Sequence, residues 1–269
     1  MKKKILLILL AIIIVSTVLT GCTGASTGKD ESWNKISEKG EFVLGLDDSF
    51  PPMGFRDDNN EIVGFDIDVA KEVCDRLGVK LTLQQIVWET KEQELNTGKI
   101  DCIWNGLTIT EDRKKELLFS EPYMNNRQVL VVKSDSTLTS LDFAGKKVAL
   151  QAGSSAADAL NAKENFKASL AEVVEFDDNM TALMDLEKGG VDAVLMDEIV
   201  ANYNIQAKNA DYKIIDEELA TESYGIGFRK NDTALRDKVQ KTLEDMAKDG
   251  KLAEISEKWF GKDLTTIAK

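Results

Sequence analysis

Apolar residues recur along the chain in two rhythms, one typical of helices and the other of strands. Between residues 66 and 77 they return every three or four positions and stop before Gly78, which predicts a helix. A shorter helix is predicted at 90–97. Compact apolar runs predict strands at 42–47, 79–86, 100–104 and 129–132.

A second series of the same kind follows. Strands are predicted at 147–150, 172–176 and 191–195, and helices at 156–162 and 180–188. This alternation favours an α/β fold with mostly parallel sheets. In both series a helix is followed by glycine, then by an Ile-Asp or Val-Asp pair that opens an apolar strand. This weak internal repeat predicts two lobes of similar build.

The ends of corresponding strands carry candidate binding residues. In open α/β sheets, ligands bind beyond the carboxyl ends of the strands. Asn105 and Gly106 follow the strand of the first series, and Asp197 follows the strand of the second. We therefore expect a cleft with hydrogen-bond donors on one side and a carboxylate on the other.

The segment 105–113 reads N-G-L-T-I-T-E-D-R and predicts an anion site. Thr110 is typical of a helix start, which places Arg113 in the first turn, where the helix dipole disfavours a cation. A residue that breaks a local rule often has another function. The Gly106 amide, the Thr108 hydroxyl and the Arg113 guanidinium together would suit a carboxylate. The alternative is a surface ion pair between Arg113 and a nearby acid.

The opposite charge comes from the second series. An α-amino acid needs a cation for its carboxylate and an anion for its ammonium group, and Arg113 and Asp197 supply the two. The alternative for Asp197 is that its side chain caps the helix that it precedes.

The first residues predict export. Three lysines, an apolar run at 5–19 and small residues before Cys22 form a secretory signal that is short for a membrane-spanning helix. The position of Cys22 resembles the bacterial lipoprotein signal, in which this cysteine is lipidated and becomes the mature N-terminus. More than one acyl chain would anchor the protein to the cell membrane. An accidental cysteine beside an ordinary cleavage site is the alternative.

Composition excludes several functions. The formal net charge is −13, which disfavours nucleic acid and anionic lipid as partners. The chain has no histidine, so catalytic triads and histidine metal sites are excluded. Only Cys74 and Cys102 remain beyond Cys22, too few for a structural zinc site. We expect two buried thiols, with a disulfide as the alternative, and no metal or cofactor.

Eight motifs occur in an order that one protein family shares. They are F-P-P-M-G-F (50–55), G-F-D-I-D-V-A-K-E-V (64–73), G-K-I-D-C-I-W-N-G-L-T-I-T-E-D-R (98–113), F-S-E-P-Y (119–123), Q-A-G-S-S-A (151–156), M-D-E (196–198), Y-G-I-G-F-R-K (224–230) and K-W-F-G (258–261). From about Glu41 to Gly261 the chain resembles bacterial extracellular solute-binding proteins of the polar amino-acid class (family 3), which feed ABC importers.

The resemblance implies a type II periplasmic-binding-protein fold with a ligand cleft between two lobes. The implied parts are a signal peptide (1–21), a lipidated tether (22–40), lobe one (41–128 and 223–269), lobe two (133–221) and two hinge strands near 129–132 and 222. It also implies the roles of the site residues. Arg113, Thr108 and the Gly106 amide would hold the ligand carboxylate, while Gly153, Ser154 and Ser155 would close on it from lobe two. Asp197 would bind the α-amino group.

The identity of the ligand would depend on other side chains, namely Asp47, Phe50, Trp88, Glu89 and Asn105. Carboxylates beside aromatic rings suit a basic or polar side chain such as arginine, lysine or histidine, and cystine or glutamine fits nearly as well. Phe50 would stack on this side chain. Asp66 and Asp68 are interpreted as acids of a helix start.

The expected function is capture of a free L-amino acid outside the cytoplasm by a monomer that delivers it to a membrane permease. A separate ATPase would hydrolyse ATP, because the chain has no phosphate-binding Gly-Lys-Ser/Thr loop. One alternative is an enzyme on the same fold, similar to cyclohexadienyl dehydratase, with Glu89 as general acid. The other is a ligand sensor.

Overall fold

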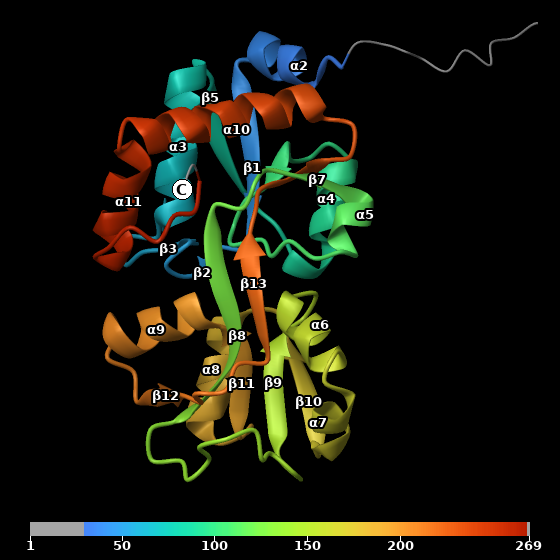
Figure 1. Ribbon diagram of the computed structural model, residues 1–269, viewed down its shortest axis with the longest axis vertical. Helices are drawn as coiled ribbons and strands as arrows, with labels where there is room; N and C mark the ends of the chain where they lie inside the picture. Colours follow the sequence, from blue (N-terminus) through green and yellow to red (C-terminus); the bar gives the residue numbers. More distant parts are fainter. Residues whose placement is uncertain (1–29, 268–269) are drawn as a thin grey trace, which may run out of the picture. The chain divides into compact units, whose positions relative to one another are not determined.

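A computed structural model describes residues 30–267 (Figure 1). The predicted signal peptide and the lipidation site at Cys22 lie outside the described residues. Two sheets organise the described chain, each covered by helices, which confirms the predicted α/β class. We call the parts built on the first and second sheets lobe one and lobe two.

Lobe one contains a five-stranded sheet in the order β5-β1-β6-β14-β7. Strand β1 runs parallel to its neighbours β5 and β6, as the alternating pattern predicted, whereas β14 is antiparallel to β6 and β7. The strands are β1 (Glu41–Leu46), β5 (Lys80–Gln85), β6 (Cys102–Ile103), β7 (Leu117–Phe119) and β14 (Gly227–Arg229). A small sheet adds β2 (Ser49–Phe50), β3 (Gly54–Arg56) and β4 (Ile62–Val63).

Helices of lobe one come from both ends of the chain. They are α2 (Ser32–Lys39), α3 (Phe65–Leu77), η1 (Trp88–Thr90), α4 (Lys91–Asn96), α5 (Arg113–Glu116), α10 (Thr233–Lys248) and α11 (Lys251–Phe260). Helix α10 contacts α2, α3 and α11. Ile36 of α2 is buried in the core, so the end of the segment 22–40, expected to be a tether, belongs to the folded lobe.

Lobe two contains a sheet in the order β10-β9-β11-β8-β12. Its strands are β8 (Met124–Lys133), β9 (Lys147–Gln151), β10 (Glu172–Phe176), β11 (Ala193–Asp197) and β12 (Tyr212–Ile214). Its helices are α6 (Ser155–Asn161), α7 (Glu164–Ser169), α8 (Asn179–Lys188) and α9 (Glu198–Gln206). Strands β9, β10 and β11 are parallel, and each predicted strand and helix of the second series has a counterpart here.

Two antiparallel strands connect the lobes. Strand β13 (Ala220–Tyr224) pairs with the first half of β8, residues 124–128, and Figure 1 shows the two running side by side between the sheets. Residues 129–131, part of the expected hinge, instead pair with β11 inside the sheet of lobe two. The connecting segments are therefore 124–128 and 220–224.

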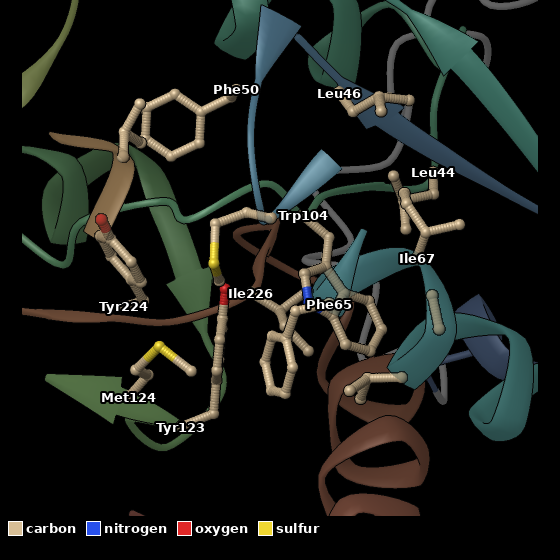
Figure 2. Packing of buried hydrophobic residues seen from close by; sticks show 14 of the residues in the cluster. Leu44, Leu46, Phe50, Phe65, Ile67, Trp104, Tyr123, Met124, Tyr224 and Ile226 are labelled. Atoms are coloured by element: carbon tan, nitrogen blue, oxygen red, sulfur yellow. The ribbon is translucent and has the colours of Figure 1, made fainter. Parts of the chain in front are cut away.

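The core of lobe one surrounds α3. Trp104 is buried in this core, and Phe65 stacks on Tyr123 with ring centroids 6.3 Å apart (Figure 2). Cys74 and Cys102 are buried and unbonded, as predicted. Burial raises the pKa of the Cys74 thiol to about 12, so both cysteines act as small apolar side chains.

Candidate functional site

A cavity between the lobes is lined by residues from both. Lobe one contributes Phe50, Trp88, Gly106, Thr108 and Arg113, and lobe two contributes Gln151, Ser154, Ser155 and Asp197. The volume of this cavity is about 10 Å³, which is roughly the room that one water molecule needs. A molecule larger than water therefore enters only when the lobes move apart.

Arg113 lies where lobe one meets lobe two. Its Nη1 donates to the Thr108 carbonyl oxygen at 2.9 Å, and its Nη2 donates to the Gly153 carbonyl oxygen of lobe two at 3.1 Å. The Thr110 hydroxyl accepts from the Arg113 N–H at 3.1 Å, although α5 begins at Arg113 and its N-cap residue is Asp112 rather than the predicted Thr110. The guanidinium thus faces lobe two with donors that suit a carboxylate.

The alternative of a surface ion pair for Arg113 is not what the structure shows. Glu111 pairs with Lys114 at 2.8 Å, and Asp112 pairs with Lys115 at 2.5 Å. Burial lowers the pKa of Arg113, and the negative charges of Glu92, Asp158, Glu222 and Asp197 act in the opposite direction. A guanidinium nevertheless stays charged in proteins.

The Gly106 amide has a partner within lobe one. Its N–H donates to Oδ2 of Asp66 at 2.8 Å, and the Tyr123 hydroxyl donates to the same oxygen at 2.9 Å. This contradicts the carboxylate-binding role predicted for the amide, because a fully buried carboxylate already takes its hydrogen bond. Asp66 is therefore more than an acid of a helix start. Burial raises its pKa to about 7.

Two hydroxyls meet across the cleft. Ser155 donates to Thr108 at 3.0 Å, whereas the Ser154 hydroxyl donates back to the Gln151 carbonyl oxygen of its own loop at 2.7 Å. Of the two serines, Ser155 is therefore the one whose side chain reaches lobe one.

Gly153 of lobe two lies close to the backbone of lobe one. A Cβ atom placed on it would lie 2.9 Å from the Cα atom of Glu89, and its φ of +67° is one that favours glycine. The site therefore requires glycine here. The Glu89 side chain is exposed and does not line the cavity.

Asp197 lines the same cavity as Arg113, from lobe two. Its Oδ1 accepts from the Tyr224 hydroxyl and from Nδ2 of Asn126, both at 2.7 Å. It precedes α9 but its side chain does not cap this helix, so the capping alternative is wrong. Burial first, and then the charge of Glu222, raise its pKa to about 7.

Asp47 of lobe one and Gln151 of lobe two form a further polar contact between the lobes, which we call the polar corner. The Asp47 carboxylate accepts from Nε2 of Gln151 at 2.7 Å and from the Ser49 N–H at 2.9 Å. Burial raises its pKa to about 6. Asn105 accepts from the Asp47 N–H at 3.2 Å and does not line the cavity. It therefore positions the Asp47 backbone and does not face the cavity.

The comparison with known proteins identifies the family of the chain. Residues 42–262 match the bacterial extracellular solute-binding proteins, family 3. The chain belongs to this family. It is 32% identical over 251 residues to the L-cystine-binding protein TcyJ of Escherichia coli strain K12, which covers 92% of this chain and 93% of that protein.

Solved structures of binding proteins share the fold. An ABC uptake transporter substrate-binding protein from Streptococcus pneumoniae with bound histidine superposes with a TM-score of 0.86 at 39% identity, over 89% of this chain and 100% of that one. The arginine-bound, truncated ArgBP from T. maritima gives 0.73 at 39% identity, over 79% of this chain and 99% of that one.

In this family 3 protein the sequence did not indicate a role for Gln151, which lines the cavity, or for Lys91, which binds the Gly153 carbonyl oxygen. Lys91 is 3% exposed and donates through Nζ to the carbonyl oxygens of Trp88 (3.1 Å) and Gly153 (2.9 Å). Burial lowers its pKa to about 8. A lysine at a helix start is usually exposed, so the sequence alone does not indicate that Lys91 is buried at the site.

The described part of this family 3 protein offers no cluster of acidic or cysteine side chains that could hold a metal ion. Within residues 30–267, no helix has the length and apolar character needed to cross a membrane.

Proposed function

We propose that the protein captures a free L-amino acid outside the cytoplasm and delivers it to the permease of an ABC importer. The observation that carries this proposal is the pair of opposite charges that line one cavity, Arg113 from lobe one and Asp197 from lobe two. A ligand with a carboxylate and an ammonium group matches both, and no single lobe supplies the whole set.

Two charged contacts of this kind are strong enough to supply much of a micromolar affinity. Micromolar affinity corresponds to about −8 kcal/mol, and a hydrogen bond to a charged group contributes roughly 1.5–3 kcal/mol. Arg113 and Asp197 therefore account for much of the affinity. They contribute nothing to discrimination among amino acids, which all share both groups.

Closure follows from the contacts between the lobes. The Arg113–Gly153 and Ser155–Thr108 hydrogen bonds join residues that a carboxylate would also contact. A ligand that bridges the lobes binds the closed form more tightly than the open form and shifts the population toward it. The closed form would then be the one that the permease recognises.

The side chain of the ligand would be basic or polar. Asp47 and Gln151 form the polar corner beyond the zwitterion pair, and Phe50 and Trp88 line the cavity with aromatic rings. An acceptor beside aromatic faces suits a cationic or strongly donating group. The relatives named above bind cystine, histidine and arginine, in keeping with this class.

The cellular setting is part of the same proposal. Lipid on Cys22 would hold the protein at the outer face of the cell membrane as a monomer, beside the permease and its ATPase. The support is the sequence around Cys22 and membership of an extracellular family.

A thermal-shift panel tests the proposed function. The protein, unfolded and refolded to remove carried-over ligand, is mixed with each common L-amino acid, cystine and ornithine. We expect a rise in the melting temperature with at least one, and none with a variant that combines Arg113→Ala and Asp197→Ala. The absence of any shift, or turnover of arogenate, would count against a transport role.

A further inference from the structure

Glu222 does not line the cavity, but it bonds to side chains that contact the cavity-lining residues. It sits on β13 directly opposite Asn126 of β8, in the paired segment that connects the lobes. Its Oε1 accepts from three side chains, namely Asn126 (2.9 Å), Gln128 (2.5 Å) and Ser155 (3.4 Å). One carboxylate oxygen thus organises three donors at the connection between the lobes.

Two of these donors also bond to residues that line the cavity. Asn126 also donates to Asp197 at 2.7 Å, and Gln128 also donates to Ser155 at 3.2 Å. The Ser155 hydroxyl also lies 3.0 Å from the Thr108 hydroxyl, and its single proton is donated either to Thr108 or to Glu222 at any one time. Through these bonds Glu222 is connected to the cavity-lining residues of lobe two and, beyond them, to lobe one.

The Asn126 amide shows how near the two carboxylates are. A single nitrogen, Nδ2, donates to Oδ1 of Asp197 and to Oε1 of Glu222. Asp197 is buried and Glu222 is half-buried. Two negative charges separated by one neutral amide repel each other there, and a cation compensates them better than an amide does.

We propose that Glu222 is a positioning residue for the ammonium end of the ligand site, acting on Asp197 through Asn126 and through its own charge. The inference rests on the proposed function, because the ammonium group is that of the captured amino acid. No contact between Glu222 and the ligand is required.

The proton affinity of Asp197 supports this role. The titratable groups that face it are Glu222 and Tyr224 of β13 and Arg113 of α5. Burial and Glu222 raise the pKa of Asp197 to about 7, while Arg113 acts in the opposite direction. Below this pH the site is partly protonated, and an arriving ammonium group must displace the proton.

Ligand affinity should therefore rise with pH. With a pKa of about 7 for Asp197, binding at pH 5.5 is about 30-fold weaker than at pH 8. Glu222→Gln keeps an oxygen that accepts hydrogen bonds but removes the charge. The proton on Asp197 is then held less tightly, and the difference between the two pH values falls below about tenfold.

The test is calorimetric titration of the wild type and variants at pH 5.5 and pH 8. The probe is the common L-amino acid with constant charge over this range that binds most tightly. Glu217→Gln, on an exposed side chain just before β13, is the matched control and should retain the wild-type dependence. Glu222→Asp, which keeps the charge, should also retain it and serves if Glu222→Gln does not fold.

Each outcome either supports or contradicts the positioning role of Glu222. A reduced pH dependence in Glu222→Gln alone supports the inference, and so does a steep dependence in Glu222→Asp. An unchanged profile in Glu222→Gln, a flat profile in Glu222→Asp or an equal reduction in Glu217→Gln overturns it while the proposed function stands. Failure of the wild type to bind any amino acid would remove both.

Discussion

Gly153→Ala separates closure of the lobes from the stability of lobe two. The added Cβ would lie 2.9 Å from the Cα atom of Glu89. Backbone atoms cannot rotate aside as a flexible side chain can, so the closed arrangement must shift. With the lobes apart this contact does not exist, and only the strain of a positive φ remains.

The magnitude follows from these two effects. A side chain in the left-handed region costs about 1–2 kcal/mol, and this cost is present whether the lobes are open or closed. Overpacking costs about 1–3 kcal/mol more, but only in the closed form. Because 1.4 kcal/mol is a factor of ten, the affinity for the amino acid should fall by about 5- to 150-fold.

Gly145→Ala is the matched control in the same lobe. Its φ is +72°, close to that of Gly153, and a Cβ there meets nothing within 4 Å. Urea denaturation should show a similar loss of stability in both variants, whereas calorimetry should show weaker binding in Gly153→Ala alone. Wild-type affinity in Gly153→Ala, or equal weakening in both, would refute the role assigned to this close approach.

Three further predictions concern the ends of the site, the buried acid of lobe one and the anchor. Arg113→Ala and Asp197→Ala should each weaken binding by about 2 kcal/mol or more, and calorimetry showing wild-type affinity would remove that residue from the site. The pKa of Asp66 is raised to about 7 in the folded protein, so ionisation favours the unfolded chain as pH rises from about 4 to 7. Asp66→Asn should reduce this loss of stability in urea denaturation at pH 4.5 and 7.5, and an unchanged slope contradicts the burial argument. Cys22→Ala should move the protein from the membrane fraction to the soluble fraction, and retention in membranes would argue against lipidation.

The elements could be predicted because they depend on local spacing. Helix α3 ends at Leu77 before Gly78, whose φ of +69° closes the helix, as the sequence indicated. The bounds predicted for the strand at 100–104 were less accurate, since β6 contains only Cys102 and Ile103. Strand ends are decided by partners, which the local sequence does not contain.

The candidate site was predicted only in part. Arg113, Thr108, Ser155 and Asp197 line one cavity, as a short motif and the internal repeat suggested. The role given to the Gly106 amide was wrong, because its partner comes from 40 residues earlier in the chain. Nothing in the local spacing of either segment indicates that contact.

The sequence by itself determined the order of strands and helices, the family and the opposite charges of the zwitterion pair, since these follow from periodicity and from residue types within short segments. Only the tertiary structure decided which partner each polar group takes. Gln151 reaches Asp47 across 104 residues of sequence, and Glu222 meets Asn126 across 96. Buried polar groups must find hydrogen bonds wherever the fold brings them together, so these partnerships exist only once both lobes have formed.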